Sequence, residues 1–168
     1  PHAGEQPVPA YPVPAPRPAP TTFPDPRIGS WSWGPLGWRF VYADGGFPAN
    51  TSAVLDSQIY RFDPSGYIRT GWAYDSGSWY YHAPTGEQVS GWVRDAFSWY
   101  YLDTASGALV TGWLLEGGSW YYLTPGSGAM AAGWQRVDGT WYYLDPASGA
   151  MVTGWLLEGG SWYYLTPG

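Results

Sequence analysis

The sequence predicts an all-β fold, a solenoid of stacked β-hairpin repeats of about 21 residues each, preceded by an extended Pro-rich segment. Two aromatic motifs recur at a nearly fixed spacing, and a turn dipeptide lies between them in most copies. Gly-Trp recurs at 71–72, 91–92, 112–113, 133–134 and 154–155. Trp-Tyr-Tyr recurs at 79–81, 99–101, 120–122, 141–143 and 162–164. Such a period is typical of arrays in which each copy buries its apolar face against the next.

Each copy is predicted to be a β-hairpin. Asp138-Gly139 lies between two β-prone runs, 134–137 and 140–144, and this dipeptide is a strong signal for a two-residue type I′ turn. The same position is occupied by Ser76-Gly77, Gly117-Gly118 and Gly159-Gly160. Ala96-Phe97 departs from the pattern because neither residue favours a positive φ, so we expect a distorted turn or another turn type there.

The turn also predicts the register of the hairpin. With a two-residue turn at 138–139, Trp134 faces Tyr143 and Arg136 faces Trp141. Opposed residues share a face and successive residues alternate, so Trp134, Trp141 and Tyr143 are expected on one face. The other face is expected to hold Tyr142, Val137 and Leu144.

Three segments follow from these patterns. Residues 1–29 are predicted to be a Pro-rich linker, because ten of the 17 prolines fall within residues 1–26 and alternating Pro favours polyproline II. Residues 30–70 are predicted to be divergent N-terminal cap repeats, with the stretch 38–56 a looser copy. Residues 71–168 are predicted to be near-consensus repeats, of which we expect the last to be truncated.

Composition argues against several classes of function. The net charge is −6 and the seven Lys and Arg residues are all scattered Arg, whereas a nucleic-acid surface needs a basic stripe. The absence of Cys excludes disulfides and thiolate chemistry. No apolar stretch is long enough for a transmembrane helix.

The sequence also argues against catalysis, and we expect neither a metal site nor a cofactor. Its two histidines are far apart, at His2 in the linker and at His82, which takes the Leu position after Trp-Tyr-Tyr. Metal sites and Ser/His/Asp arrangements need clustered groups. The repeat acidic residues are expected to be turn formers. They are Asp75, Asp95, Glu116, Asp138 and Glu158.

The paired Trp and the Tyr of each copy are the candidate binding residues. They could simply form a core, but Trp and Tyr carry polar atoms that need partners when buried. Three large rings more naturally line concave pockets between neighbouring hairpins. The negative faces of such rings attract a quaternary ammonium group, which cannot donate hydrogen bonds. Flat sugar faces can stack on the same rings, so the rings alone leave both ligands open.

The motif GW-x4-G-x-WYYL-x4-5-G-x-M-x-TGW resembles the choline-binding repeat of Gram-positive surface proteins and phage lysins. It is clearest from Gly133 to Trp155, and the resemblance is close over 71–168 and loose over 38–70. The resemblance implies a β-solenoid with choline pockets made by two aromatics of one repeat and one of the next, with Met contributing.

The resemblance also implies which residues line the pockets. The ring positions are Trp72, Trp79, Tyr81, Trp92, Trp99, Tyr101, Trp113, Trp120, Tyr122, Trp134, Trp141, Tyr143, Trp155, Trp162 and Tyr164. The apolar position falls on Ile68, Leu109, Met130 and Met151. Gln88 replaces it in one repeat, and Ile59 and Arg61 replace rings in the early copy, where no complete site is expected.

The sequence therefore predicts a non-catalytic module that anchors a larger secreted protein to the choline groups of (lipo)teichoic-type polymers. We expect it to be extracellular and cell-wall associated. Two alternatives stay open at this point. One is binding of glucan or another wall carbohydrate, and the other is a purely structural stalk.

Overall fold

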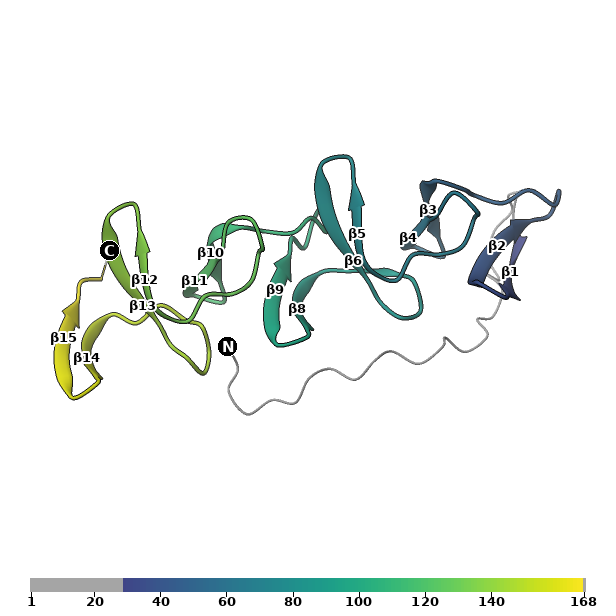
Figure 1. Cartoon of the computed structure of the whole chain (residues 1–168). Helices are drawn as coiled ribbons and strands as arrows, with labels where there is room; N and C mark the ends of the chain where they lie inside the picture. Colours follow the sequence, from purple (N-terminus) through teal and green to yellow (C-terminus); the bar gives the residue numbers. More distant parts are fainter. Residues whose placement is uncertain (1–28, 168) are drawn as a thin grey trace. The chain divides into compact units, whose positions relative to one another are not determined.

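The computed structural model describes residues 29–167. Residues 1–28 of the predicted linker lie outside this range. The described residues form strands, turns and loops without a helix, which confirms the all-β class (Figure 1). The strands are β1 (Gly29–Gly34), β2 (Gly37–Tyr42), β3 (Thr51–Leu55), β4 (Gln58–Phe62), β5 (Gly71–Asp75), β6 (Ser78–His82), β7 (Gln88–Val89), β8 (Gly91–Asp95), β9 (Ser98–Leu102), β10 (Gly112–Glu116), β11 (Ser119–Leu123), β12 (Gly133–Val137), β13 (Thr140–Leu144), β14 (Gly154–Glu158) and β15 (Ser161–Leu165).

The described chain divides into two compact units. The N-terminal unit contains residues 29–90 and Thr104–Ala108, with strands β1 to β7. The C-terminal unit contains Gly91–Asp103 and residues 109–167, with strands β8 to β15. Each unit has its own core of aromatic and aliphatic side chains.

Consecutive strands pair as antiparallel hairpins, and β7 adds a third strand beside β6. Trp134 pairs with Tyr143 and Arg136 with Trp141, as the two-residue turn predicts. Asp138 and Gly139 have φ values of 49° and 82°, and a type I′ turn requires positive φ at both central residues. The predicted hairpin repeat and its register are therefore confirmed.

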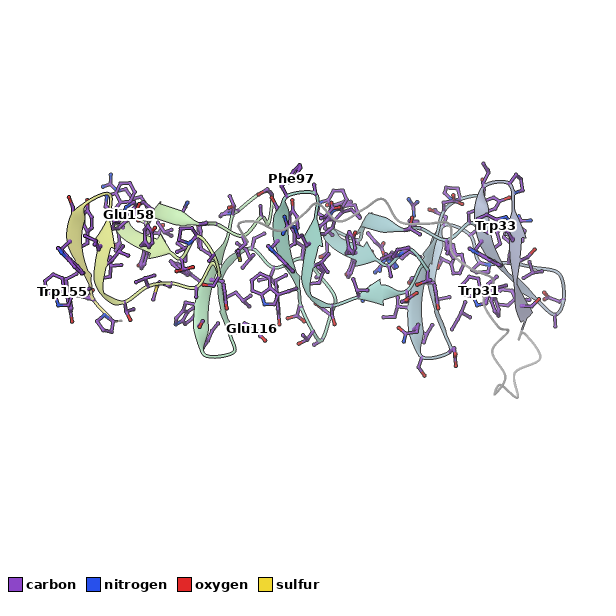
Figure 2. All side chains as sticks on the ribbon, turned by 90° about the horizontal axis from the view of Figure 1, so that it is seen from below. Trp31, Trp33, Phe97, Glu116, Trp155 and Glu158 are labelled. Carbon is purple, nitrogen blue, oxygen red and sulfur yellow. The ribbon has the colours of Figure 1, made fainter. Side chains whose placement is uncertain are left out.

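The turn at Ala96-Phe97 differs from the others, as the sequence predicts. Ala96 has a φ of 54°, whereas Phe97 is not among the described residues with positive φ. Only the first central residue is left-handed, so the turn is not type I′. Arg94 still pairs with Trp99, and the Phe97 side chain projects from the end of the hairpin with 71% exposure (Figure 2).

In the C-terminal unit, the loops after hairpins β10–β11 and β12–β13 each bond back to the hairpin one repeat earlier. Met151 follows β13 and forms an isolated bridge with Leu144. Its backbone N–H donates to the carbonyl of Trp120 on β11 at 2.7 Å. The N–H of Met130, in the loop after β11, donates in the same way to the carbonyl of Trp99 on β9 at 2.8 Å. These bonds hold successive hairpins of this unit in a stack, as the sequence predicts.

The core of the C-terminal unit is built from the leucine that follows Trp-Tyr-Tyr in β9, β11 and β13. Leu102, Leu123 and Leu144 are all 0% exposed. Leu123 clusters with Tyr101 and Met130, which come from the preceding hairpin and the following loop. The leucines therefore fill the space between neighbouring hairpins, where a two-stranded ribbon alone could bury little.

The N-terminal unit has an aromatic core instead. Phe40, Tyr60 and Phe62 are almost fully buried, and the ring of Trp31 lies 4.8 Å from that of Tyr60 in an edge-to-face arrangement. The stretch 38–56, predicted as one looser copy, spans β2 and β3, which belong to two different hairpins.

Candidate functional site

A cavity of about 220 Å³ in the C-terminal unit is lined by three aromatic rings and a thioether. Trp113 comes from β10 and Trp120 from β11, so one hairpin supplies two walls. Tyr142 comes from β13 of the next hairpin. Met151 comes from the loop after that hairpin, where its backbone bond to Trp120 holds it. The cavity therefore forms only when two hairpins stack.

The rings meet at steep angles. The Trp113 and Trp120 ring centroids are 6.4 Å apart with planes at 89°, and Trp113 meets Tyr142 at 4.7 Å and 68°. Trp120 retains 42% exposure, so its ring is open to a ligand. No charged side chain lines the cavity. Ring faces carry negative partial charge, so the cavity suits a compact cation without hydrogen-bond donors.

The structure places the third ring differently from the sequence prediction. Tyr122, the predicted residue, packs against Trp113 with ring centroids 4.9 Å apart and is not among the residues that line the cavity. Tyr142 lines it instead, although its register puts it on the opposite face of its own hairpin from Trp141. A pocket between stacked hairpins uses opposite faces of the two hairpins, and this rule could have identified Tyr142 from the sequence.

The second tyrosine of two repeats connects neighbouring hairpins. Tyr143 is 5% exposed and its hydroxyl donates to Glu158 at 2.9 Å. Tyr101 is also 5% exposed and donates to Glu116 at 3.0 Å. Burial first, and then the adjacent glutamate, raises the pKa of each tyrosine. Both glutamates, predicted as turn formers, lie at the ends of hairpins (Figure 2).

The arrangement of two perpendicular Trp rings recurs. Trp134 and Trp141 are 6.4 Å apart at 88°, and Tyr163 of the next hairpin lies 4.9 Å from Trp134. Trp155 and Trp162 are also 6.4 Å apart, at 85°, and both are highly exposed in the last hairpin. The remaining predicted ring of that hairpin, Tyr164, lies 5.2 Å from Trp155.

In hairpins β8–β9 and β12–β13, an arginine lies beside the second Trp. Tyr121 of the next hairpin lies 4.9 Å from Trp92, and Met130 is bonded at Trp99, so the same residue types come together. The guanidinium of Arg94 lies 6.0 Å from the centroid of the Trp99 ring, and that of Arg136 lies 5.9 Å from the centroid of the Trp141 ring. A protein cation therefore lies over one side of each of these two Trp rings. The predicted apolar residue Leu109 packs in this unit as an isolated bridge to Leu102.

In the N-terminal unit, the predicted rings Trp72 and Tyr81 pack together, and Trp79 packs against Tyr74. Trp72 meets Tyr81 edge-on at 5.0 Å, Tyr81 is 3% exposed, and Trp79 is 44% exposed. The preceding hairpin lacks the aromatic pair. Arg61 stands where later repeats have the second tyrosine, and its guanidinium lies 3.7 Å from the centroid of the Tyr80 ring.

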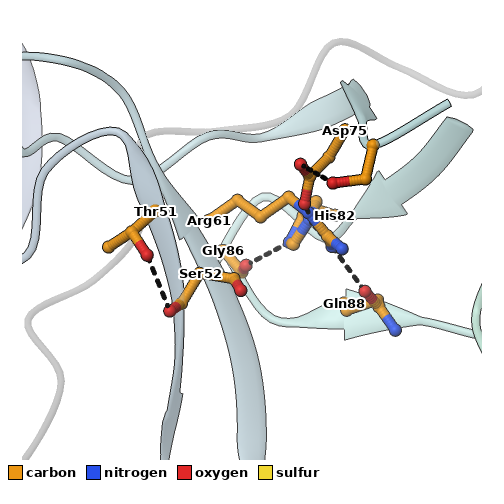
Figure 3. Close-up of polar contacts among 8 residues, drawn as sticks. Thr51, Ser52, Arg61, Asp75, His82, Gly86 and Gln88 are labelled. Carbon is orange, nitrogen blue, oxygen red and sulfur yellow. Dashed lines mark hydrogen bonds and ion pairs between the residues drawn. The ribbon is translucent and has the colours of Figure 1, made fainter. Parts of the chain in front are cut away.

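Arg61 is the centre of a polar cluster (Figure 3). Its Nε donates to Asp75 Oδ2 at 3.1 Å, and its Nη1 donates to Gln88 Oε1. His82 is 0% exposed, and its Nδ1 donates to the carbonyl of Gly86 at 2.8 Å. Arginine can only donate, so His82 Nε2 accepts from Arg61 Nη1 at 3.2 Å and His82 is neutral. Gln88, expected to disrupt a pocket, is a partner of this arginine.

This cluster predicts a loss of stability in mild acid. Burial, with Arg61 adding to it, lowers the pKa of His82, so the unfolded chain binds a proton that the folded chain does not. Stability should therefore be full above the unfolded pKa of about 6.5 and decline as pH falls below it, by up to about 1.4 kcal/mol per pH unit. Thermal melts at pH 7.5 and 5.5 measure this.

The control for this prediction is His82→Leu, which installs the residue that other repeats carry here. This variant should lose much of the decline between the two pH values, because no buried imidazole is left to charge. An equal decline in the variant and the natural chain would contradict the assignment. The lowered pKa of Asp75 affects stability only below its ordinary value of 3.8, so Asp75 does not contribute to a difference between pH 7.5 and 5.5.

Within residues 29–167, no group of three or more His, Cys, Asp or Glu side chains could hold a metal ion. No helix suited to crossing a membrane occurs in the same range.

The chain is similar to known proteins in both sequence and structure. The family described as choline-binding repeat matches residues 69–111, 90–132 and 131–168. The structure of CbpJ from Streptococcus pneumoniae TIGR4 is 38% identical with a TM-score of 0.74, covering 81% of this chain and 49% of that one. No curated sequence is significantly similar to the chain.

Two further structures are similar. Choline binding protein F from Streptococcus pneumoniae, determined in the presence of a peptidoglycan analogue, is 35% identical with a TM-score of 0.73, covering 81% of this chain and 49% of that one. The cell wall endolysin from phage Cp-1 complexed with choline is 33% identical with a TM-score of 0.56, covering 79% and 40%. The chain spans about half the length of CbpJ and choline binding protein F.

The family matches run through residues 69–168, more than half of the chain, and include the hairpins that bring Trp pairs and a Tyr of the next hairpin together. The chain belongs to the choline-binding repeat family.

Proposed function

We propose that this chain binds choline groups in aromatic pockets between stacked hairpins and thereby anchors a larger protein to a choline-bearing cell-wall polymer. The observation that carries the proposal is the cavity formed by Trp113, Trp120, Tyr142 and Met151. Family membership supports it, as does the similarity to a phage endolysin complexed with choline. The module acts outside the cell, at the wall, and it has no catalytic part in this role.

The chemistry of the cavity fits a quaternary ammonium group. Such a group is compact, permanently charged and unable to donate a hydrogen bond, so ring faces replace its hydration shell. Each ring contributes about 0.5–2 kcal/mol, and three rings give roughly 3–5 kcal/mol, which corresponds to about millimolar affinity for free choline. Met151 closes the apolar wall, where a soft thioether adapts to the methyl groups.

Weak affinity at each single pocket is compatible with firm anchoring, because one chain carries several pockets that bind the same polymer. The Trp134–Trp141 pair with Tyr163 is the second candidate, and the Trp92–Trp99 pair with Tyr121 the third. Once one pocket holds a choline, the others meet neighbouring cholines of the same polymer at a high effective concentration. The predicted second tyrosines, such as Tyr143, support the pocket walls from behind.

A ligand titration tests the proposal. Choline should change the fluorescence of the Trp rings with a dissociation constant in the millimolar range, because the cation sits on their faces. Glucose oligomers at equal concentration serve as the matched neutral ligand and should leave the emission unchanged. A response to glucose oligomers alone would establish the carbohydrate alternative. No response to either ligand would favour a structural stalk and overturn the proposal.

A further inference from the structure

The N-terminal unit contains a second cavity, of about 320 Å³, that is polar rather than aromatic. Its lining comes from hairpins β3–β4 and β5–β6, the adjoining residues and the turn after β5. Ser52 and Arg61 face each other across β3 and β4, the same register positions that hold Trp113 and Tyr122 beside the aromatic cavity. Ser52 thus replaces a Trp ring with a hydroxyl, and Arg61 replaces a Tyr ring with a guanidinium.

The charges around this cavity sum to a positive value. Arg61 and Arg69 contribute two guanidinium groups, and Asp75 contributes one carboxylate. Both oxygens of that carboxylate are engaged, since Oδ2 accepts from Arg61 Nε at 3.1 Å and Oδ1 accepts from Ser76 Oγ at 3.0 Å. Asp75 therefore holds Arg61 in place, and Arg69 supplies the excess charge. This local excess stands out in a chain of net charge −6.

Hydrogen-bond donors also remain for a ligand. Arg61 is 9% exposed, with Nε and Nη1 bonded, and Nη2 makes no hydrogen bond to any described residue. The side chain of Arg69 makes none within residues 29–167 either. Asn50, Thr51 and Ser52 line the same cavity and carry an amide and two hydroxyl groups. Figure 3 draws Thr51 and Ser52 together with Arg61. Two guanidinium groups beside such donors suit an oxyanion with attached hydroxyls.

The ring of Tyr74 completes the cavity. It lines the opening, is 63% exposed and rests on Trp79 with ring centroids 5.1 Å apart. An exposed ring held in this way offers a flat apolar surface for the C–H face of a sugar. A volume near 300 Å³ lies at the lower end of small-ligand pockets and exceeds what a bare phosphate needs.

We propose that this cavity binds a sugar phosphate unit, with Arg61 and Arg69 at the phosphate and Asn50, Ser52 and Tyr74 at the sugar. The site is separate from the aromatic pockets in residues and in ligand chemistry. It would give the module a second contact with an anionic, sugar-containing polymer. The inference does not depend on choline binding, because no residue is shared between the two cavities.

The test is a titration of the 168-residue chain with glucose 6-phosphate, followed by the NMR amide signals of residues 50–52 and 74–76. Arg69→Gln should weaken binding at least about tenfold, because it removes a charge-assisted contact from an exposed side chain. Arg136→Gln removes the same charge from an exposed position outside the cavity and should change the affinity less than about twofold. Raising the ionic strength should weaken binding in the natural chain.

Each ligand comparison has a decisive outcome. Glucose that binds as tightly as glucose 6-phosphate would overturn the phosphate assignment, and inorganic phosphate that binds as tightly would overturn the sugar assignment. Equal losses in the Arg69 and Arg136 variants would remove the site from this cavity. A chain that binds glucose 6-phosphate but not choline would refute the proposed function alone, and the reverse would refute this inference alone.

Discussion

Replacing Trp120 with alanine should eliminate choline binding at the 220 Å³ cavity while leaving the chain folded. The ring forms one complete wall, and its loss removes both a cation–π contact and the enclosure, so affinity at this pocket should fall at least about tenfold. Trp120 is 42% exposed, so the stability cost should stay well below that of truncating a buried Trp. Isothermal titration with choline should give one site fewer, and adhesion to the polymer should fall more steeply.

Two controls make this result specific. Trp33→Ala truncates a Trp of similar exposure, 50%, in hairpin β1–β2, and it should leave the number of choline sites unchanged. Tyr142→Ala should resemble Trp120→Ala, because Tyr142 is the third wall. Tyr143→Phe should keep every site, since it removes only the buried hydroxyl that donates to Glu158. An unchanged choline stoichiometry in Trp120→Ala would show that the rings are core alone.

Replacing Leu123 with alanine should have the largest effect on stability. The side chain is 0% exposed and packs with Tyr101 and Met130, between neighbouring hairpins of the C-terminal unit. Truncating it leaves a cavity where two hairpins meet, so the free energy of unfolding should fall by about 2–5 kcal/mol. Urea unfolding monitored by circular dichroism measures this loss.

Leu115→Ala is the matched control for that experiment. Leu115 lies on β10 of the same hairpin but is 55% exposed, so the same truncation should change stability by less than about 0.5 kcal/mol. A similar, small effect at both positions would contradict the assignment of the leucine row to the core. Choline affinity in molecules of the Leu123 variant that stay folded should be close to that of the natural chain.

Tyr–Glu hydrogen bonds join the hairpins of the C-terminal unit in pairs. Tyr101 bonds Glu116 and Tyr143 bonds Glu158, each across one hairpin boundary. At the boundary between these pairs, the residue equivalent to the glutamates is Val137, which has no carboxylate. The spacing of identical segments, 111–126 and 153–168, has the same two-repeat period. In hairpins β10–β11, β12–β13 and β14–β15, the last residue of the first strand, Glu or Val, therefore determines whether a Tyr–Glu bond joins that hairpin to the one before it.

Much of the fold is determined locally by the sequence. Asp138-Gly139 takes positive φ at both residues and fixes the register, so the pairing of Trp134 with Tyr143 follows from two residues alone. The exception at Ala96-Phe97 was predictable for the same reason, because a bulky residue such as Phe97 resists the positive φ that Gly139 adopts in the equivalent position. Turn chemistry acts over a few bonds, and a repeated motif shows it several times in one chain.

What the sequence could not determine is the relation between one hairpin and the next. Periodicity shows which residues share a face of a hairpin, but it does not show which face meets the neighbour. The structure brings Trp113 against Tyr142 of the next hairpin, places Tyr143 behind the walls, and gives Arg61 the partners Asp75 and His82 from later strands. Stacking is decided by the packing of side chains and by loop hydrogen bonds such as that of Met151 to Trp120. These interactions join residues distant in sequence, so the composition of each pocket arises only in the tertiary structure.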